Sequence, residues 1–166
     1  MKEIPLSQGK VALVDDEDWH RLSQKRWSAI RDDNMFYAAR TIQVNRKSRM
    51  IRMHREVLGL QHRDGIMCDH WDRNGLNNQK HNLRICSNSQ NQANSGKQKR
   101  PGHSIYKGVS FFSNWVHPAK PWTSTVICQK KRVNLGVFRT ESNAARAYDE
   151  AARRMFGNYA RINGVI

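Results

Sequence analysis

An aspartate and a histidine stand side by side at Asp69-His70, and two asparagines follow at Asn82 and Asn91, 12 and 21 residues beyond the histidine. Carboxylate and amide oxygens are the hard ligands that Mg²⁺ prefers, so Asp69 and Asn91 are candidate metal ligands. The imidazole of His70 has an ordinary pKa near neutrality and can take a proton from water. We therefore expect one divalent metal ion, Mg²⁺ or Mn²⁺, and a general base, a combination that hydrolyses phosphodiester bonds.

Asn82 is predicted to act indirectly, through a hydrogen bond that fixes the tautomer and orientation of the His70 imidazole. The alternative is a surface hydrogen bond between aspartate and histidine, without catalysis. A zinc site made by Cys68, His70 and His81 is a further alternative, but its spacing suits no common zinc geometry. We expect no zinc.

The elements that position these residues follow from the surrounding pattern. Residues 66–70 and 81–86 are predicted strands, joined by a loop over 72–80 that contains the turn dipeptide Asn74-Gly75. After the second strand, Ser87-Asn88-Ser89-Gln90 matches a capping box. The helix that it opens should run to about residue 95 and bring the four side chains together.

Upstream, the sequence predicts a short helix over 18–24 and strands over 27–30, 35–44 and 49–53. The last two strands form a hairpin rich in cations. A two-stranded ribbon fits the major groove of B-DNA, so this hairpin is a candidate DNA-binding element. The alternative is an exposed basic edge that discourages aggregation. The cations in question are Arg40, Arg46, Lys47, Arg49 and Arg52.

Composition indicates a polyanionic partner independently, because 29 Lys and Arg residues against 14 Asp and Glu give a net charge of +15. Residues 97–166 carry 13 of these cations and only 3 of the anions. We expect double-stranded DNA as the partner. A non-catalytic DNA-binding regulator and a basic RNA-binding protein are the alternatives.

No apolar run approaches the ~20 residues that a membrane-spanning helix needs, so no membrane association is expected. No apolar signal region follows the basic start, and the three cysteines form no Cys-x-x-Cys pair. These features predict a cytoplasmic protein with reduced thiols.

Residues 97–104 are predicted to form a basic linker between two folded parts, because they lack apolar periodicity and contain Pro101-Gly102. Lys97, Lys99 and Arg100 are its candidate phosphate contacts. A solvated connector that touches nothing is the alternative.

Beyond the linker, apolar residues alternate around Val109, Val126 and Val133, which predicts three short strands. The segment 114–121 and Gln129-Lys130-Lys131 supply the turns. Thr140 should cap a helix that runs through Phe156 and is closed by Gly157, with an alanine-rich stripe packed on the sheet.

Residues 54–95 resemble the HNH (ββα-metal) nuclease motif of phage and intron homing endonucleases. The resemblance rests on Met53-His54-Arg55, Asp69-His70, Asn77-Asn78, Asn82-Leu83-Arg84 and 89–94. It implies that Asp69 and Asn91 are metal ligands, that His70 is the general base and that Asn82 supports it. His54 and Arg55 would contact phosphate or hold the strand beside the site. The family cuts DNA to leave a 5′-phosphate and a 3′-hydroxyl.

Residues 105–166 resemble the Apetala/ethylene-response-factor DNA-binding domain. The matching residues are Tyr106-Lys107-Gly108-Val109, Trp122, Leu135-Gly136, Phe138, 144–149 and Asn163. The resemblance implies a three-stranded sheet whose outer face lies in the major groove. The residues that it directs to DNA are Lys107, Ser110, Thr125, Ile127, Arg132 and Asn134, with Lys130 and Lys131 as further phosphate contacts.

The expected architecture is α+β. An N-terminal antiparallel β region leads into an HNH unit over 1–96, with its core at 54–95. The linker 97–104 follows, and then 105–166 forms a three-stranded antiparallel sheet packed on one helix. The expected function is that of a site-recognising, metal-dependent DNA endonuclease of the homing type, from a phage or its bacterial host, that acts as a monomer and can nick one strand.

Overall fold

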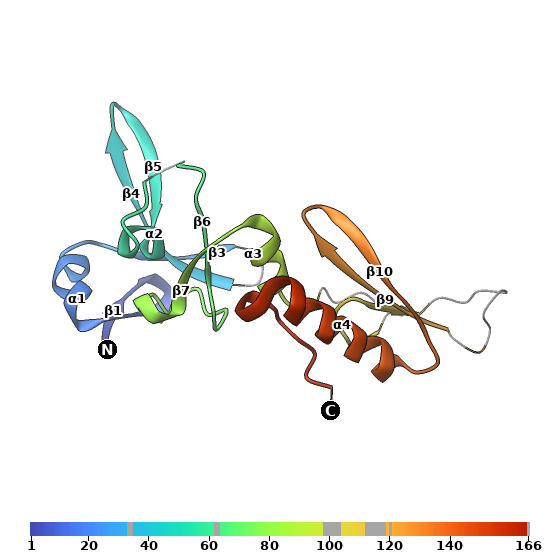
Figure 1. The fold of residues 1–166 in the computed structure, drawn as a ribbon. Helices are drawn as coiled ribbons and strands as arrows, with labels where there is room; N and C mark the ends of the chain where they lie inside the picture. Colours follow the sequence, from blue (N-terminus) through green and yellow to red (C-terminus); the bar gives the residue numbers. More distant parts are fainter. Residues whose placement is uncertain (33–34, 62–63, 98–103, 112–118, 120, 166) are drawn as a thin grey trace. The chain divides into compact units, whose positions relative to one another are not determined.

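The computed structural model describes residues 1–32, 35–61, 64–97, 104–111, 119 and 121–165 (Figure 1). It is an α+β protein built from small antiparallel sheets and short helices, as the sequence predicts. The chain divides into two compact units, Met1–Ser87 and Asn88–Ile166. The boundary therefore precedes the helix that follows Ser87, whereas the sequence predicts a boundary after residue 96.

The N-terminal unit begins with a hairpin of β1 (Lys2–Pro5) and β2 (Val11–Val14), followed by α1 (Asp16–Ser23). Asp16, Glu17 and Asp18 occupy the first turn of α1, where negative charge meets the positive end of the helix dipole. A three-stranded sheet follows, with β3 (Ser28–Asp32), β4 (Met35–Val44) and β5 (Lys47–Arg52) in that order. The β4–β5 hairpin projects from the rest of this unit (Figure 1).

Helix α2 (Met53–Val57) starts directly after β5, where the sequence predicts that the strand continues through Met53. The hairpin of β6 (Met67–His70) and β7 (Leu83–Cys86) completes the unit. A 3-10 turn at Lys80–Asn82 replaces the predicted start of the second strand. The core that joins these elements contains Ile4, Ala12, Val14, Leu22, Trp27, Ala38, Met53, Val57 and Leu83.

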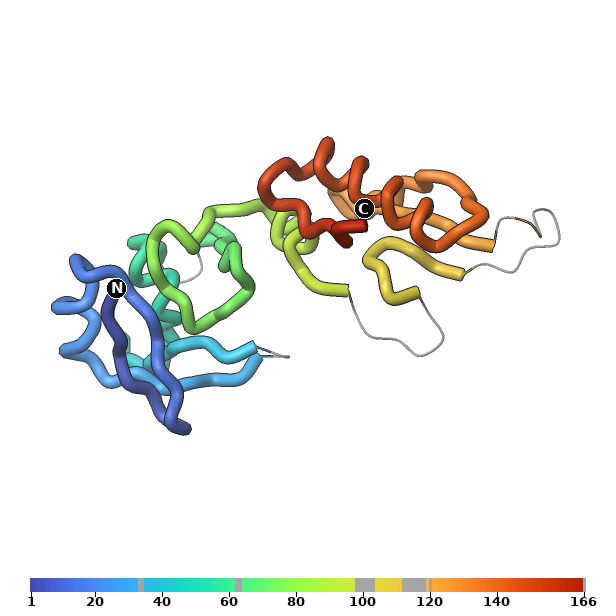
Figure 2. Tube along the Cα trace, turned by 90° about the horizontal axis from the view of Figure 1, so that it is seen from below, coloured from blue at the N-terminus to red at the C-terminus, as the bar shows by residue number. Residues whose placement is uncertain are grey.

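The C-terminal unit opens with α3 (Asn88–Asn94). Its sheet has the order β10-β9-β8, formed by β8 (Val109–Phe111), β9 (Trp122–Cys128) and β10 (Lys131–Phe138). Helix α4 (Glu141–Phe156) lies along one face of this sheet (Figure 2). The three predicted strands and the helix are confirmed. The predicted turn over 114–121 lies almost entirely outside the described residues.

Thr140 caps α4 as predicted, since its hydroxyl accepts a hydrogen bond of 3.2 Å from the Asn143 amide. Gly157 ends the helix with a φ of 53°. Alanines on the packed face of α4 let Tyr148 approach the backbone at Gly108. A Cβ added at Gly108 would lie 2.0 Å from the tyrosine ring. The buried stripe consists of Ala144, Ala145, Tyr148, Ala151, Ala152 and Phe156.

Within the described parts of the chain, no helix has both the length and the apolar character needed to cross a bilayer.

Candidate active site

The β6–β7 hairpin presents the predicted catalytic pair. Asp69 lies opposite Arg84 and His70 lies opposite Leu83 in the antiparallel register. Neighbouring strand residues point to opposite faces, so the two side chains leave the hairpin on different sides. Both are nevertheless buried, with 5% of Asp69 and 7% of His70 exposed. The pair is therefore part of the folded interior and not a surface contact.

Asp69 is held by Arg84 in a two-pronged ion pair. The guanidinium donates from Nε to Oδ1 at 3.0 Å and from Nη2 to Oδ2 at 2.8 Å. An ionised carboxylate is an acceptor-only group with two oxygens, and Arg84 contacts both of them. The donor type suits Mg²⁺ or Mn²⁺, and Arg84 fixes the orientation of the carboxylate.

His70 belongs to a cluster of three rings with Tyr37 and His54. The two imidazoles meet edge to face with a centroid separation of 4.9 Å, and Tyr37 lies 5.8 Å from His70. Burial lowers the pKa of His70 below its ordinary value, although a hydrogen bond with Asn78 and the nearby carboxylate of Asp72 oppose the shift. The imidazole is therefore neutral at pH 7, the form that accepts a proton.

His54 lies on α2 and is 6% exposed, so its side chain offers almost no surface to a phosphate. Its predicted role, a phosphate contact or a residue that holds the strand beside the site, stays a prediction. Burial, followed by His70 and the neighbouring arginines, lowers the pKa of His54 to about 3. Its Nδ1 is buried without a hydrogen-bond partner among the described residues.

The side chain of Asn82 organises the loop that follows His70. Its Nδ2 donates to Asp72 Oδ1 and to the Asn77 carbonyl, both at 2.9 Å, and its Oδ1 accepts from the Asp72 amide at 3.0 Å. These three bonds use the side chain's hydrogen-bonding groups. The predicted support of the His70 imidazole by Asn82 stays a prediction.

Asn78 is a second buried asparagine of this loop. It is 1% exposed, and its side chain is the one that raises the pKa of His70 by hydrogen bonding. Asn77-Asn78 is visible in the sequence, but its burial depends on the N-terminal hairpin. Leu13 of β2 donates to the Leu76 carbonyl and accepts from the Asn78 amide, both at 2.8 Å.

Two further contacts fix the same loop. Asp15, at the start of α1, accepts hydrogen bonds from the Lys80 amide at 2.7 Å and from the Gln79 side chain at 3.0 Å. Gly75 lies against β4, where an added Cβ would sit 2.4 Å from the Phe36 carbonyl and 2.7 Å from the Tyr37 ring. The loop after His70 is thus clamped from both sides.

Three of the cations predicted to bind DNA make structural ion pairs. Arg40 contacts Glu56 Oε2 through both Nε and Nη2, at 3.1 and 3.0 Å. Arg52 pairs with Asp32 at 2.5 Å and lies 4.9 Å over the Tyr37 ring. These contacts hold β4, β5 and α2 together, so the charges are largely neutralised within the unit.

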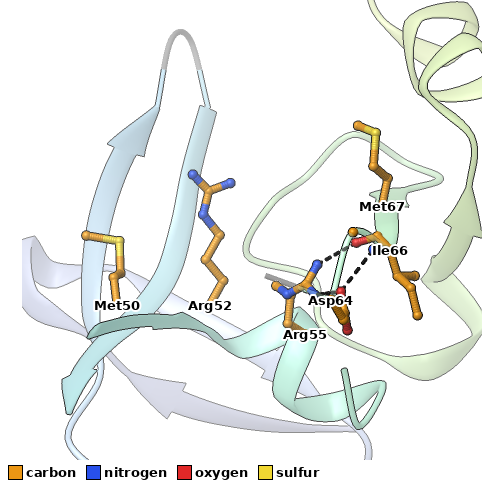
Figure 3. A pocket seen from close by; sticks show the side chains of 7 residues that line it. Met50, Arg52, Arg55, Asp64, Ile66 and Met67 are labelled. Atoms are coloured by element: carbon orange, nitrogen blue, oxygen red, sulfur yellow. Dashed lines mark hydrogen bonds and ion pairs between the residues drawn. The ribbon is translucent and has the colours of Figure 1, made fainter. Parts of the chain in front are cut away.

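Arg55 on α2 is the third of these cations, and it ties down the segment before β6. It donates to Asp64 at 2.5 Å and to the Ile66 carbonyl at 2.7 Å (Figure 3). Arg52 and Arg55 line a pocket of about 370 Å³ with Met50, Asp64, Gly65, Ile66 and Met67. Its mixed apolar and charged lining belongs to the N-terminal unit.

The tip of the β4–β5 hairpin carries the remaining cations of this group. Asn45 and Arg46 form the two-residue turn, with φ values of 51° and 61°. Lys47 and Arg49 of β5 point to the same face of the sheet as Arg40 of β4, whereas Arg52 points to the opposite face. Arg46, Lys47 and Arg49 are exposed. The predicted basic ribbon therefore divides its charges between two faces.

On the C-terminal sheet, the residues predicted to face DNA share one surface. Arg132 lies opposite Ile127, Asn134 opposite Thr125, and Ser110 opposite Thr123. This face lies away from α4, whose partners Ser124 and Val126 are buried on the other side. Lys130 sits in the two-residue turn before Lys131, and both are exposed.

Lys107 serves α3 instead of an open surface. Its ammonium donates to the carbonyls of Gln92, Ala93 and Ser95 at 3.0, 2.5 and 2.8 Å. A cation on the last carbonyls of a helix meets the negative end of the dipole. The charge that was predicted for phosphate is thus engaged in helix capping.

The predicted metal ligand Asn91 lies on α3 in the C-terminal unit and is half-buried. Its role as a ligand stays a prediction. Lys97 is described and half-buried, whereas the linker residues Lys99 and Arg100 lie outside the described residues. A search against protein-family models finds no match for this chain.

Proposed function

We propose that this protein is a metal-dependent endonuclease of the HNH homing type that hydrolyses phosphodiester bonds in double-stranded DNA. The observation that carries the proposal is the buried pair Asp69-His70. It combines a fixed carboxylate with an imidazole kept neutral at pH 7. One such pair per chain suits a monomer that nicks one strand.

In this proposal His70 takes the proton from the attacking water. Asn78 holds its ring, and the clamped loop keeps the ring in place. Asp69 would hold Mg²⁺ or Mn²⁺, and Arg84 orients its carboxylate. When bound, the metal ion stabilises negative charge on the phosphate and on the leaving oxygen.

DNA affinity would come from cations that remain exposed. Arg46, Lys47 and Arg49 at the hairpin tip, with Lys130, Lys131 and Arg132 on the C-terminal sheet, are free to reach phosphates. Ser110, Thr125 and Asn134 on the same sheet face are the candidate contacts to base edges. The net charge of +15 supports association with a polyanion.

The test replaces the proposed base by His70→Ala, with His81→Ala as the matched control because His81 is an exposed histidine next to β7. Loss of general base catalysis typically costs about 10²–10⁴-fold in rate. We expect His70→Ala to lose cleavage by that factor and to bind duplex DNA as the unaltered chain does. Mg²⁺-dependent cleavage by a pure preparation of His70→Ala at the original rate would refute the role of His70.

A further inference from the structure

Trp71 directly follows the proposed general base, and its indole is 60% exposed. It is the only exposed tryptophan among the described residues. Single exposed apolar side chains are common on protein surfaces, so exposure alone carries little weight. What distinguishes Trp71 is how firmly the surrounding residues hold it.

The backbone on both sides of Trp71 is fixed by Asn82. The Trp71 amide donates to the Asn82 carbonyl at 2.9 Å, and the Asp72 amide donates to Asn82 Oδ1 at 3.0 Å. The Arg84 guanidinium lies 6.0 Å from the indole centroid and is itself held by Asp69. The ring is thus presented on a rigid support, which lowers the entropic cost of placing a ligand against it.

The position of Trp71 determines which nucleotide of the bound DNA its ring would contact. Its indole centroid lies 6.0 Å from the Arg84 guanidinium, which pairs with the proposed metal ligand Asp69. A base stacked on this ring would therefore belong to a nucleotide close to the scissile phosphate. In intact B-DNA the flat faces of the bases are covered by stacking, so the ring can meet one only where a base step has opened.

We propose that Trp71 stacks on an unstacked nucleobase that flanks the scissile phosphate, so that the enzyme favours DNA with a locally opened base step. This inference deepens the proposed function and rests on it. Base–aromatic stacking tolerates any sequence because every base has a π-face. Trp71 would therefore select the shape of the DNA at the cut, while other residues select the sequence.

The experiment compares Trp71→Leu, Trp71→Phe and Ile85→Ala with the unaltered chain. Leucine keeps an apolar side chain without a π-face, phenylalanine restores the ring, and Ile85 is a matched apolar control on β7 that is 57% exposed. Affinity is measured in EDTA for a short DNA duplex and for the same duplex with an unpaired central base. Thermal melting establishes that each variant is folded.

We expect the unaltered chain, Trp71→Phe and Ile85→Ala to prefer the duplex with the unpaired base. Trp71→Leu should bind that duplex roughly tenfold more weakly, equivalent to ~1.4 kcal/mol, and lose the preference. DNA binding should also quench tryptophan fluorescence less in Trp71→Phe.

Equal affinity and equal preference for Trp71→Leu and the unaltered chain would overturn the stacking role. Because binding is measured without metal, that result leaves cleavage, and with it the proposed function, untouched. If the unaltered chain binds neither duplex, both proposals fail together.

Discussion

His54 and His70 lie ring against ring in the interior of the N-terminal unit, and both have lowered pKa values because they are buried. Protonation of His54 would place a buried cation beside Arg52 and Arg55. Burial therefore favours the neutral form of both rings in the folded protein. That property links the stability of this unit to pH.

We predict that the free energy of unfolding decreases as the pH falls from about 6.5 toward 3. The pKa of His54 is about 3 in the folded state and ~6.5 in the unfolded state, so the unfolded chain binds an extra proton in this range. The slope from one such group reaches ~1.4 kcal/mol per pH unit. His54→Phe should flatten the slope.

Urea titrations at pH 6.5, 5.5 and 5 measure this effect, because most carboxylates stay ionised in both states at these values. His20→Phe is the matched control, since His20 is an exposed histidine of the same unit. An unchanged slope in His54→Phe would contradict the assigned pKa of His54.

For single residues, the sequence predicts that Asp69 and His70 lie together on one strand, but it does not predict every side chain that contacts them. Asp69 and His70 are visible because aspartate, histidine and asparagine recur at spacings that suit a metal site. The Arg84 partner of Asp69 follows only from strand register, and the Asn78 partner of His70 only from the fold of a loop. Side-chain partners across a loop depend on tertiary contacts, which a sequence pattern does not specify.

The loop over 72–80 is the element on which the proposed site depends most. Backbone hydrogen bonds from β2 and the carboxylate of Asp15 hold one end, and Gly75 packs against β4. Because Gly75 has an ordinary φ, its lack of a side chain is required by space and not by backbone conformation.

We predict that Gly75→Ala destabilises the N-terminal unit by ~1–3 kcal/mol, because the new Cβ would collide with the Phe36 carbonyl and the Tyr37 ring. The same change would stabilise by up to ~1 kcal/mol if space were available, since alanine restricts the unfolded chain. A urea titration measures the change in the free energy of unfolding, and the sign of that change shows whether Gly75 lies against β4. A stabilised Gly75→Ala would show that the loop does not lie against β4.

Elements with clear periodicity could be predicted from the sequence, and short ones could not. Strand β4 and helix α4 match their predicted bounds because each has a sustained apolar pattern and a defined end signal. Helix α2 has five residues, too few for a helical period to emerge, and the sequence predicts a strand for its first residue, Met53. Strand β1 was not predicted either, since Pro5 closes it after four residues.

Among the described residues, the cations predicted to bind DNA fall into two groups. Arg40, Arg52, Arg55 and Lys107 neutralise carboxylates or cap a helix, and the others at the hairpin tip and on the C-terminal sheet stay exposed. A count of charges predicts a polyanionic partner but cannot separate these groups, because each structural pair joins residues far apart in sequence.

We predict different effects of two lysine substitutions in the C-terminal unit. Lys131→Met should reduce the slope of log affinity for duplex DNA against log salt by ~1, the value for one lost phosphate contact. Lys107→Met should leave that slope unchanged and loosen α3, whose last carbonyls it caps. Amide hydrogen exchange over 88–95 reports the loosening.

A reduced salt slope in Lys107→Met, with α3 protected as before, would reverse the assignment and return Lys107 to the phosphate contacts.

The proposed chemistry is tested most directly by incubating supercoiled plasmid with the purified chain in Mg²⁺ and in EDTA. The account predicts nicked or linear product that bears a 5′-phosphate in Mg²⁺ and intact supercoiled plasmid in EDTA. The plasmid should carry natural DNA that contains target sites. If this plasmid is bound in Mg²⁺ but stays supercoiled over a long incubation, the result would contradict the nuclease and indicate a DNA-binding regulator.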